Sequence, residues 1–195
     1  MEATPPRKRP GAAPPAVRFR PAALGDAAML QRWLAEPHVR RFYREPFETL
    51  GALIDYYGPA IRGEEPTLCH IALGDGAPFG FIQCYRNLAY PDYARLIGAE
   101  EGISIDLYIG EPDFVGKGFG RAMLLAYLTD VAFPAYPGEP TAYIAHELDN
   151  AAALNCSRSV GFQPLRRVLE DGVWDQLLVL RREDLERTKG PAEVA

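Results

Sequence analysis

The 195-residue chain has few of the residues that build disulfide frameworks or metal sites. It has three cysteines, Cys69, Cys84 and Cys156, and no two of them form a C-x-x-C pair. An odd number of distant cysteines argues against a disulfide framework and a structural zinc site, and it favours a reducing, cytoplasmic compartment. The three histidines also lack metal-ligand spacing, so we expect no bound metal.

Long hydrophobic runs and an excess of basic charge are missing too. The longest apolar runs are much shorter than the roughly 20 residues that a membrane span needs, so we expect no membrane partner. Lys and Arg number 21 against 26 Asp and Glu, a net charge of −5. Because nucleic-acid affinity rests on basic patches, this balance disfavours a nucleic-acid partner and suits a cationic ligand.

The length predicts one domain with short tails. Residues 1–16 contain five prolines and a basic cluster but no apolar segment, which predicts a disordered Pro-rich basic tail rather than a signal peptide. Residues 183–195 are polar and predict a frayed C-terminal tail. The domain is therefore expected at 17–182, as a monomer or homodimer.

Strands and helices are mixed between the tails. Strands are expected at 17–20, 67–73, 78–85, 102–109, 141–146, 165–170 and 174–180, and helices at 25–35, 49–61, 121–133 and 150–159. Residues 86–101 are expected to form a long loop. The order predicts a mixed α and β fold with a strand, a glycine-rich loop, a helix and a strand in its middle.

Three alternate glycines, Gly116, Gly118 and Gly120, lie between the expected strand at 102–109 and the helix that follows. Such a turn at a helix N-terminus points uncovered backbone N–H groups outward and is an anion site, typically for phosphate. The spacing fits neither G-x-x-x-x-G-K-[ST] nor G-x-G-x-x-G, so it indicates neither a P-loop nor a dinucleotide fold.

This loop and the run before it carry a family resemblance. Residues 105–112 (IDLYIGEP) followed by 116–120 (GKGFG) resemble the GNAT superfamily of N-acetyltransferases, and among them the aminoglycoside 6'-N-acetyltransferases. Residues 33–43, 78–85 and 150–162 agree with that family. The resemblance covers about 17–182. It implies a GNAT-like α/β (α+β) fold, with a mixed, mostly antiparallel sheet of about six to seven strands, helices on both faces, and a splay between the central strands.

The resemblance also implies acetyl-CoA as acyl donor, with no metal. The acyl-pantetheine would lie in the splay between 105–109 and 141–146, bonded to the strand backbone, with the pyrophosphate on the glycine-rich loop. The residues implied in binding acetyl-CoA are Tyr108, Ile109, Val115, Gly116, Lys117, Gly118, Phe119, Gly120, Arg121 and Asn150.

Asp106 is the candidate catalytic residue. Strict alternation places Ile105, Leu107 and Ile109 on one side of the sheet, and Asp106 with Tyr108 on the other. An acid within an apolar strand is costly unless it is paired or lies at a cleft. An amine acceptor arrives mostly as an ammonium, and a carboxylate beside the thioester binds that cation and passes its proton on through water.

The acceptor site is expected to be acidic and aromatic. Five acids fall at 100–113, and aromatic faces suit sugars and cations. The candidate substrate-binding residues are Trp33, Phe42, Tyr43, Tyr85, Tyr93, Glu101 and Asp106.

The chain departs from the subfamily pattern at three positions and from the superfamily pattern at a fourth. Leu107 replaces a Gln, Ala145 an acid, Ser157 the tyrosine of the last helix, and Val115 the Arg or Gln that opens the superfamily's loop. Because a serine hydroxyl lacks the acidity of a phenol, we expect slower chemistry or another proton donor, such as Tyr108 or water.

The leading hypothesis is an acetyl-CoA-dependent N-acetyltransferase acting on a primary amine of a cationic small molecule, an aminoglycoside 6'-amine. Two alternatives stay open. One is a lysine or hydroxylysine (siderophore-type) or polyamine acyltransferase; the siderophore enzymes typically carry His where this chain has Asp106. The other is a non-catalytic acyl-CoA-binding module.

Overall fold

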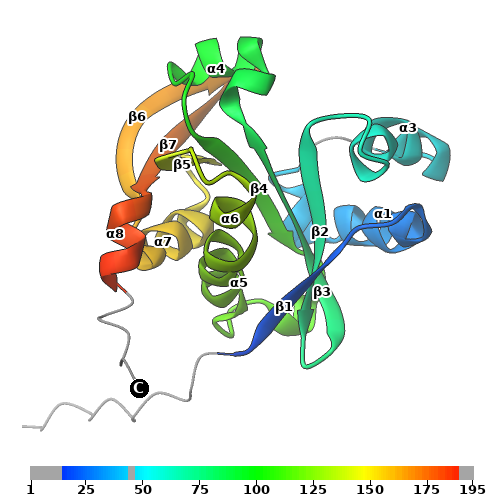
Figure 1. Ribbon diagram of the computed structural model, residues 1–195. Helices are drawn as coiled ribbons and strands as arrows, with labels where there is room; N and C mark the ends of the chain where they lie inside the picture. Colours follow the sequence, from blue (N-terminus) through cyan, green and yellow to red (C-terminus); the bar gives the residue numbers. More distant parts are fainter. Residues whose placement is uncertain (1–14, 44–46, 189–195) are drawn as a thin grey trace, which may run out of the picture.

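The computed structural model describes residues 15–43 and 47–188, so the expected N-terminal tail lies almost wholly outside it. Seven strands form one sheet in the order β1-β2-β3-β4-β5-β7-β6 (Figure 1). All neighbours are antiparallel except β4 and β5, which are parallel. This confirms the expected mixed, mostly antiparallel sheet. The strands are β1 (Val17–Pro21), β2 (Thr67–Gly74), β3 (Ala77–Arg86), β4 (Ile103–Ile109), β5 (Thr141–Glu147), β6 (Gln163–Glu170) and β7 (Val173–Arg181).

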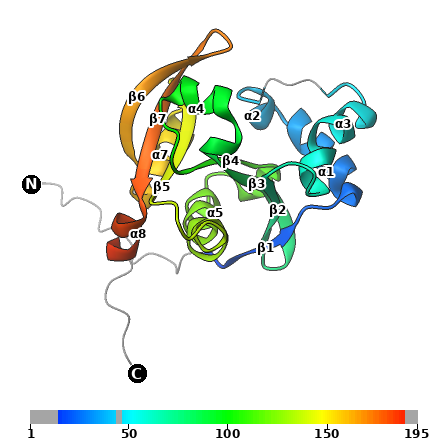
Figure 2. The same ribbon diagram turned by 45° about the horizontal axis from the view of Figure 1, so that its top comes forward.

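Helices cover both faces of the sheet, as expected. On one face α1 (Ala27–Ala35), α2 (Pro37–Arg40) and α3 (Leu50–Ile61) bury Leu30, Trp33 and Leu53 against the sheet. On the other face, a helical run of α5 (Phe119–Tyr127), a π-helical segment (Leu128–Ala132) and α6 (Phe133–Ala135) forms the main core together with α7 (Ala151–Val160). Figure 2 shows β6 and β7 as a long twisted hairpin beside α4 (Pro91–Ile97).

Capping residues fix the helices that carry the site. The Asn150 side chain accepts a hydrogen bond from the Ala153 amide at 3.2 Å and so begins α7. Gly161 ends α7 at φ 117°, a left-handed conformation that favours glycine. Thr49 caps α3 in the same way as Asn150, through the Ala52 amide at 3.1 Å. These signals are local, so the sequence predicts the ends of both helices to within a residue or two.

Two expectations about irregular segments are wrong. Residues 86–101 are not a long loop: they contain a 3-10 turn (Asn87–Ala89) and α4, which begins at Pro91 and ends at Gly98 in a left-handed conformation. Residues 183–188 are not frayed, because they belong to α8 (Arg182–Thr188). Leu185 is buried in the main core, and the Arg182 guanidinium donates to the carbonyls of Phe133, Tyr136 and Glu139.

The parallel pair β4 and β5 separates after two residues. Pairing is limited to Ile103 with Ala142 and Ser104 with Tyr143, and the strands then diverge. On its other side, β4 stays paired with β3 as far as Ile109. The expected splay between the central strands is therefore confirmed, and it opens beside Asp106.

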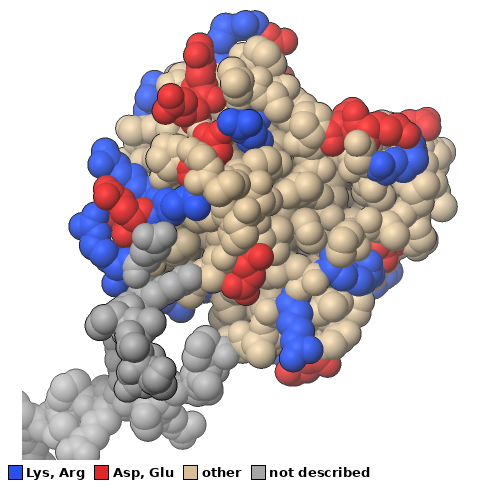
Figure 3. Space-filling model, in the orientation of Figure 1, with Lys and Arg blue, Asp and Glu red and all other residues tan. Residues whose placement is uncertain are grey.

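Charge is unevenly distributed over the surface. Figure 3 shows basic side chains gathered over β6 and α8, and acidic side chains near the end of α3. Across the described residues, no helix combines the length and apolar character needed to span a bilayer.

Candidate active site

A cavity of about 970 Å³ opens where β4 and β5 separate. Its lining includes side chains from both faces of the sheet. Asp106 and Tyr85 belong to the face of α1–α3, whereas Leu124, Ile144 and Ser157 belong to the face of α5 and α7. The cavity therefore passes through the sheet at the gap between β4 and β5.

Asp106 lies at the centre of this cavity. The alternation along β4 is as expected: Ile105, Leu107 and Ile109 pack in the main core, and Tyr108 packs on the other face. The Asp106 carboxylate accepts a hydrogen bond from the Gln83 side chain, Nε2 to Oδ2, at 3.1 Å. Gln83 is the cross-strand partner of Asp106 on β3, so sheet pairing fixes the position of this carboxylate.

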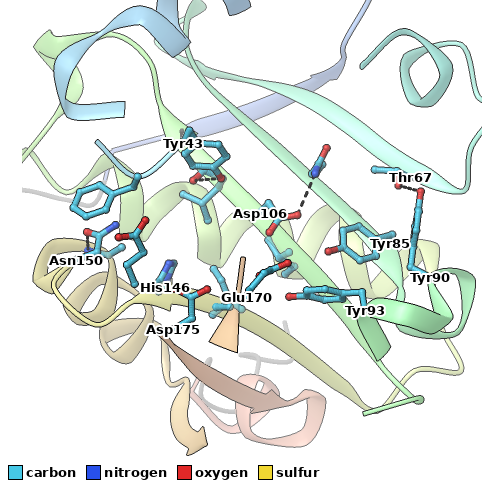
Figure 4. A pocket seen from close by; sticks show the side chains of 18 of the residues that line it. Tyr43, Thr67, Tyr85, Tyr90, Tyr93, Asp106, His146, Asn150, Glu170 and Asp175 are labelled. Atoms are coloured by element: carbon cyan, nitrogen blue, oxygen red, sulfur yellow. Dashed lines mark hydrogen bonds between the residues drawn. The ribbon is translucent and has the colours of Figure 1, made fainter. Parts of the chain in front are cut away.

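Two tyrosines face Asp106 from β3 and α4. The Tyr85 and Tyr93 rings meet edge to face, with centroids 5.9 Å apart. Burial first, and the negative charge of Asp106 second, raise the pKa of both phenols. Figure 4 shows Tyr85, Tyr93, Asp106 and Glu170 around one space. Both hydroxyls therefore keep their protons at neutral pH and remain hydrogen-bond donors and acceptors.

The cavity is strongly acidic. Its wall holds seven carboxylates, and none of the Lys or Arg residues that the structure describes lines it. The acids come from α3, the segment before β2, β4, β5 and the β6–β7 hairpin: Asp55, Glu65, Asp106, Glu147, Glu170, Asp171 and Asp175. Such a surface attracts a ligand with several positive charges.

Glu170 is the acid most affected by this crowding. It ends β6, half-buried, beside Asp175 on β7. Burial raises the pKa of Glu170 to about 7, and the charges of Asp175, Asp106 and Asp171 add to that effect. Its charge therefore changes within the physiological pH range.

The α7 side of the cavity carries a histidine and a serine in contact. The His146 Nε2 atom lies 2.8 Å from the Ser157 Oγ atom, and both residues line the cavity. Ser157 is almost fully buried. Burial lowers the pKa of His146 to about 4, so its imidazole is neutral at physiological pH.

The glycine-rich loop leaves the start of α5 open. Gly116 and Gly118 have φ values of 73° and 87°, and a Cβ atom at either position would meet nothing within 4 Å. The first amides of α5 have no partner within the helix. The Arg121 guanidinium donates to the Ser159 carbonyl at the end of α7, which fixes its position beside the loop. The loop therefore fits an anionic group such as a pyrophosphate.

Five of the residues expected to bind substrate line the cavity, and two do not. Phe42, Tyr43, Tyr85, Tyr93 and Asp106 line it. Trp33 is fully buried, and its Nε1 atom donates to Glu111 at 2.8 Å. Glu101 is exposed outside the cavity, and the neighbouring acids Glu100, Glu111 and Asp113 do not line the cavity either. The structure therefore places Trp33 and Glu101 outside the cavity.

The residues expected to bind acetyl-CoA are placed as follows. Asn150 lines the cavity as well as capping α7. The Tyr108 side chain packs against Tyr43 and Phe81 outside the cavity, which argues against its use as a proton donor. The Ile109 carbonyl accepts a hydrogen bond from His38 Nε2 at 2.9 Å. Val115, Gly116, Lys117 and Gly118 lie on the loop before α5. Phe119, which packs on Phe79 and Phe114, lies in the first turn of α5 with Gly120 and Arg121.

Sequence reasoning missed most of the acidic wall. The acids at 55, 65, 170, 171 and 175 lie far from 106 in the chain, and only the sheet order brings them together. The sequence offers only a weak indication of these acids. Glu170 and Asp171 lie where the expected strand at 165–170 ends, and acids at such turns are ordinary surface residues. Among the described residues, no three His, Cys, Asp or Glu side chains are arranged to hold a metal ion.

Comparison with known proteins gives a consistent result. A family model described as an acetyltransferase (GNAT) domain matches residues 23–169. Aminoglycoside N(6')-acetyltransferase type 1 of Klebsiella pneumoniae is 26% identical over 174 residues, 86% of this chain and 84% of that protein. The protein of the same name from Serratia marcescens is 26% identical over 171 residues, 84% of this chain and 82% of that protein.

A solved structure agrees with both sequence matches. The structure of AAC(6')-Ib with ribostamycin and coenzyme A superposes with a TM-score of 0.79 at 26% identity, covering 91% of this chain and 99% of that one. The family match spans most of the chain, including the splayed strands and the glycine-rich loop. The chain belongs to the GNAT family of acetyltransferases.

Proposed function

We propose that this protein transfers the acetyl group of acetyl-CoA to a primary amine of a polycationic small molecule, an aminoglycoside 6'-amine. The observation that carries the proposal is the cavity through the sheet, whose wall holds seven carboxylates and, within the described chain, neither Lys nor Arg. A multiply charged amine suits that wall. The relatives named as aminoglycoside N(6')-acetyltransferases support the choice of acceptor.

The residues present fit acetyl-CoA as the acyl donor. The open loop at Gly116–Gly118 and the first-turn amides of α5 suit a pyrophosphate, with Lys117 and Arg121 close by in the chain. The gap between β4 and β5 suits the extended pantetheine arm, since the two strands leave that side of β4 unpaired beyond Ser104. The solved AAC(6')-Ib structure with coenzyme A supports this donor.

Asp106 then acts on the acceptor. Its carboxylate, held by Gln83, attracts the ammonium and takes up a proton, directly or through water, so that a neutral amine attacks the thioester carbonyl. Aromatic rings beside it, those of Tyr43, Tyr85 and Tyr93, pack against a sugar or an alkyl chain. The C–N bond forms, the C–S bond breaks, and coenzyme A leaves as a thiolate.

The proposal predicts a pH effect that depends on Glu170. The Glu170 pKa of about 7 means that this side chain loses its charge as the pH falls from 8 to 6. We therefore expect the acceptor KM to rise about threefold to fivefold over that range, because one attractive charge is lost. In Glu170→Gln the KM should be high throughout, with most of that pH dependence gone.

Steady-state kinetics with kanamycin as acceptor, at saturating acetyl-CoA, measure this effect. Glu100→Gln is the matched control, because Glu100 is exposed and lies outside the cavity. It should keep the wild-type profile. An identical pH dependence of KM in wild type and Glu170→Gln would show that Glu170 does not contact the acceptor.

A further inference from the structure

The His146–Ser157 pair is unexplained by the assignments made above. Ser157 stands where the aminoglycoside 6'-N-acetyltransferases usually carry a tyrosine, and its own acidity is too weak for it to replace a phenol. In the structure, however, the Ser157 hydroxyl is not isolated. Its Oγ atom contacts His146 Nε2 at 2.8 Å, and both residues line the gap that the proposed function assigns to the thioester.

The elements around this pair hold it in place. Along β5 the side chains of Ala142 and Ile144 pack in the main core, so alternation points His146 to the same face, toward α7. Ser157 lies in the middle of α7 and is 1% exposed. Asp106 lies on the opposite face of the sheet. The carboxylate and the His146–Ser157 pair therefore flank the gap from its two sides.

The hydrogen bond between His146 and Ser157 gives the two residues different roles. A serine hydroxyl has one proton, and its direction is set by whatever donates to its oxygen. When His146 carries its proton on Nε2, that N–H donates to Ser157 Oγ, and the Ser157 proton is free to point into the gap. The neutral imidazole makes this arrangement possible, because its second nitrogen needs no proton.

We infer that Ser157 donates a hydrogen bond to the sulfur of the acyl donor as it leaves, and that His146 is the positioning residue that directs the Ser157 hydroxyl. This inference rests on the proposed function. In the step, the amine nitrogen forms the C–N bond, the C–S electron pair stays on sulfur, and the Ser157 hydrogen bond stabilises the resulting thiolate. No proton leaves Ser157. Two protons leave the nitrogen: the ammonium proton goes to Asp106 or water before the attack, and the second goes to water as the tetrahedral intermediate collapses to the amide. The thiolate takes its proton from solvent.

The first test is a double-mutant cycle on acetyl transfer. Ser157→Ala and His146→Leu should each lower kcat about tenfold, the size of one hydrogen bond to a charged group, with little change in the KM for acetyl-CoA. Because His146 acts only through Ser157, the double variant should be no slower than Ser157→Ala alone. His146→Gln, which keeps an N–H donor, should recover most of the activity.

The matched control is a second histidine–hydroxyl pair outside the cavity. His70 Nδ1 lies 3.0 Å from the Tyr127 hydroxyl, on β2 and α5. His70→Leu removes a comparable contact and should leave kcat unchanged, with thermal unfolding used to match the loss of stability. Independent, additive losses in the cycle, or a wild-type kcat in Ser157→Ala, would overturn the inference.

The second test needs no acceptor and separates this inference from the proposed function. Calorimetry at several alkaline pH values, over which the free coenzyme A thiol is converted to thiolate, compares the Kd of coenzyme A with that of desulfo-coenzyme A. The preference for the sulfur compound should fall about fivefold in Ser157→Ala and in His146→Leu. An unchanged preference overturns the sulfur contact. Wild-type protein that shows the preference but transfers no acetyl group would overturn the proposed function alone.

Discussion

Asp106→Asn is expected to lower kcat about a hundredfold, the usual contribution of a positioned general base. Asparagine keeps the size of the side chain and an oxygen that accepts the Gln83 hydrogen bond, so the sheet should be undisturbed. It has no charge to attract the ammonium and no basic site for its proton. The change should therefore appear mainly in kcat, with a smaller rise in the acceptor KM. Acceptor-dependent release of the coenzyme A thiol measures both constants.

Asp130→Asn is the control for this prediction. Asp130 is an exposed aspartate on the helical run after α5, far from the cavity lining, and its loss should leave kcat unchanged. Near-wild-type turnover in Asp106→Asn would remove Asp106 from its assigned role.

Gly118→Val is expected to raise the KM for acetyl-CoA about thirtyfold with a much smaller change in kcat. A Cβ at Gly118 meets no atom within 4 Å, so the cost is not a clash. It is backbone strain, because a β-branched residue rarely adopts the φ of 87° that this position requires. To relieve the strain the loop must change shape, and its amides then no longer converge on one anion.

Gly76→Val is the control that separates the loss of the anion site from the loss of stability caused by backbone strain. Gly76 has a φ of 84° in the turn between β2 and β3, also with nothing within 4 Å of a Cβ. Both variants should lose similar thermal stability, but only Gly118→Val should weaken the binding of coenzyme A in calorimetry. If the two variants bind coenzyme A equally well, the glycine-rich loop does not hold the pyrophosphate.

Much of this fold can be predicted from the sequence, because strand alternation and helix caps depend on residues close together in the chain. Apolar alternation places Asp106 opposite Ile105 and Leu107, and both caps of α7 are readable from Asn150 and Gly161. The error at α4 has a local cause too. Pro91 and Gly98 bound a helix of only seven residues, too short for a clear apolar period.

The acidic wall is harder to predict, since it depends on which strands become neighbours. The other four acids at 100–113 were expected around the site, but none of them lines the cavity. Glu111, for example, accepts from Trp33 and pairs with Arg32. The acids that surround Asp106 in space, such as Glu170 and Asp175, come from a hairpin that joins the sheet through β5. Contacts of that separation are set by topology, not by composition.

Ser157 shows the same limit in a single residue. In the sequence, Ser157 replaces the tyrosine that the resembled subfamily carries in its last helix. That replacement alone suggests a slower enzyme or a non-catalytic binding module. In the structure Ser157 contacts His146 from another element, which gives its hydroxyl a direction. The effect of this replacement therefore depends on His146, eleven residues away, which the sequence of α7 alone does not show.

Thiol release from acetyl-CoA with a panel of acceptors tests the central claim most directly. The panel contains kanamycin, spermidine and free lysine, each at several concentrations, with Asp106→Asn as the matched protein. We predict thiol release that depends on kanamycin, an acetyl group on the 6'-amine of the product, and a lower kcat/KM for spermidine and lysine than for kanamycin. Release only with spermidine or lysine would contradict the assigned acceptor. No release with any acceptor would contradict catalysis and leave a protein that binds acyl-CoA without transferring its acyl group.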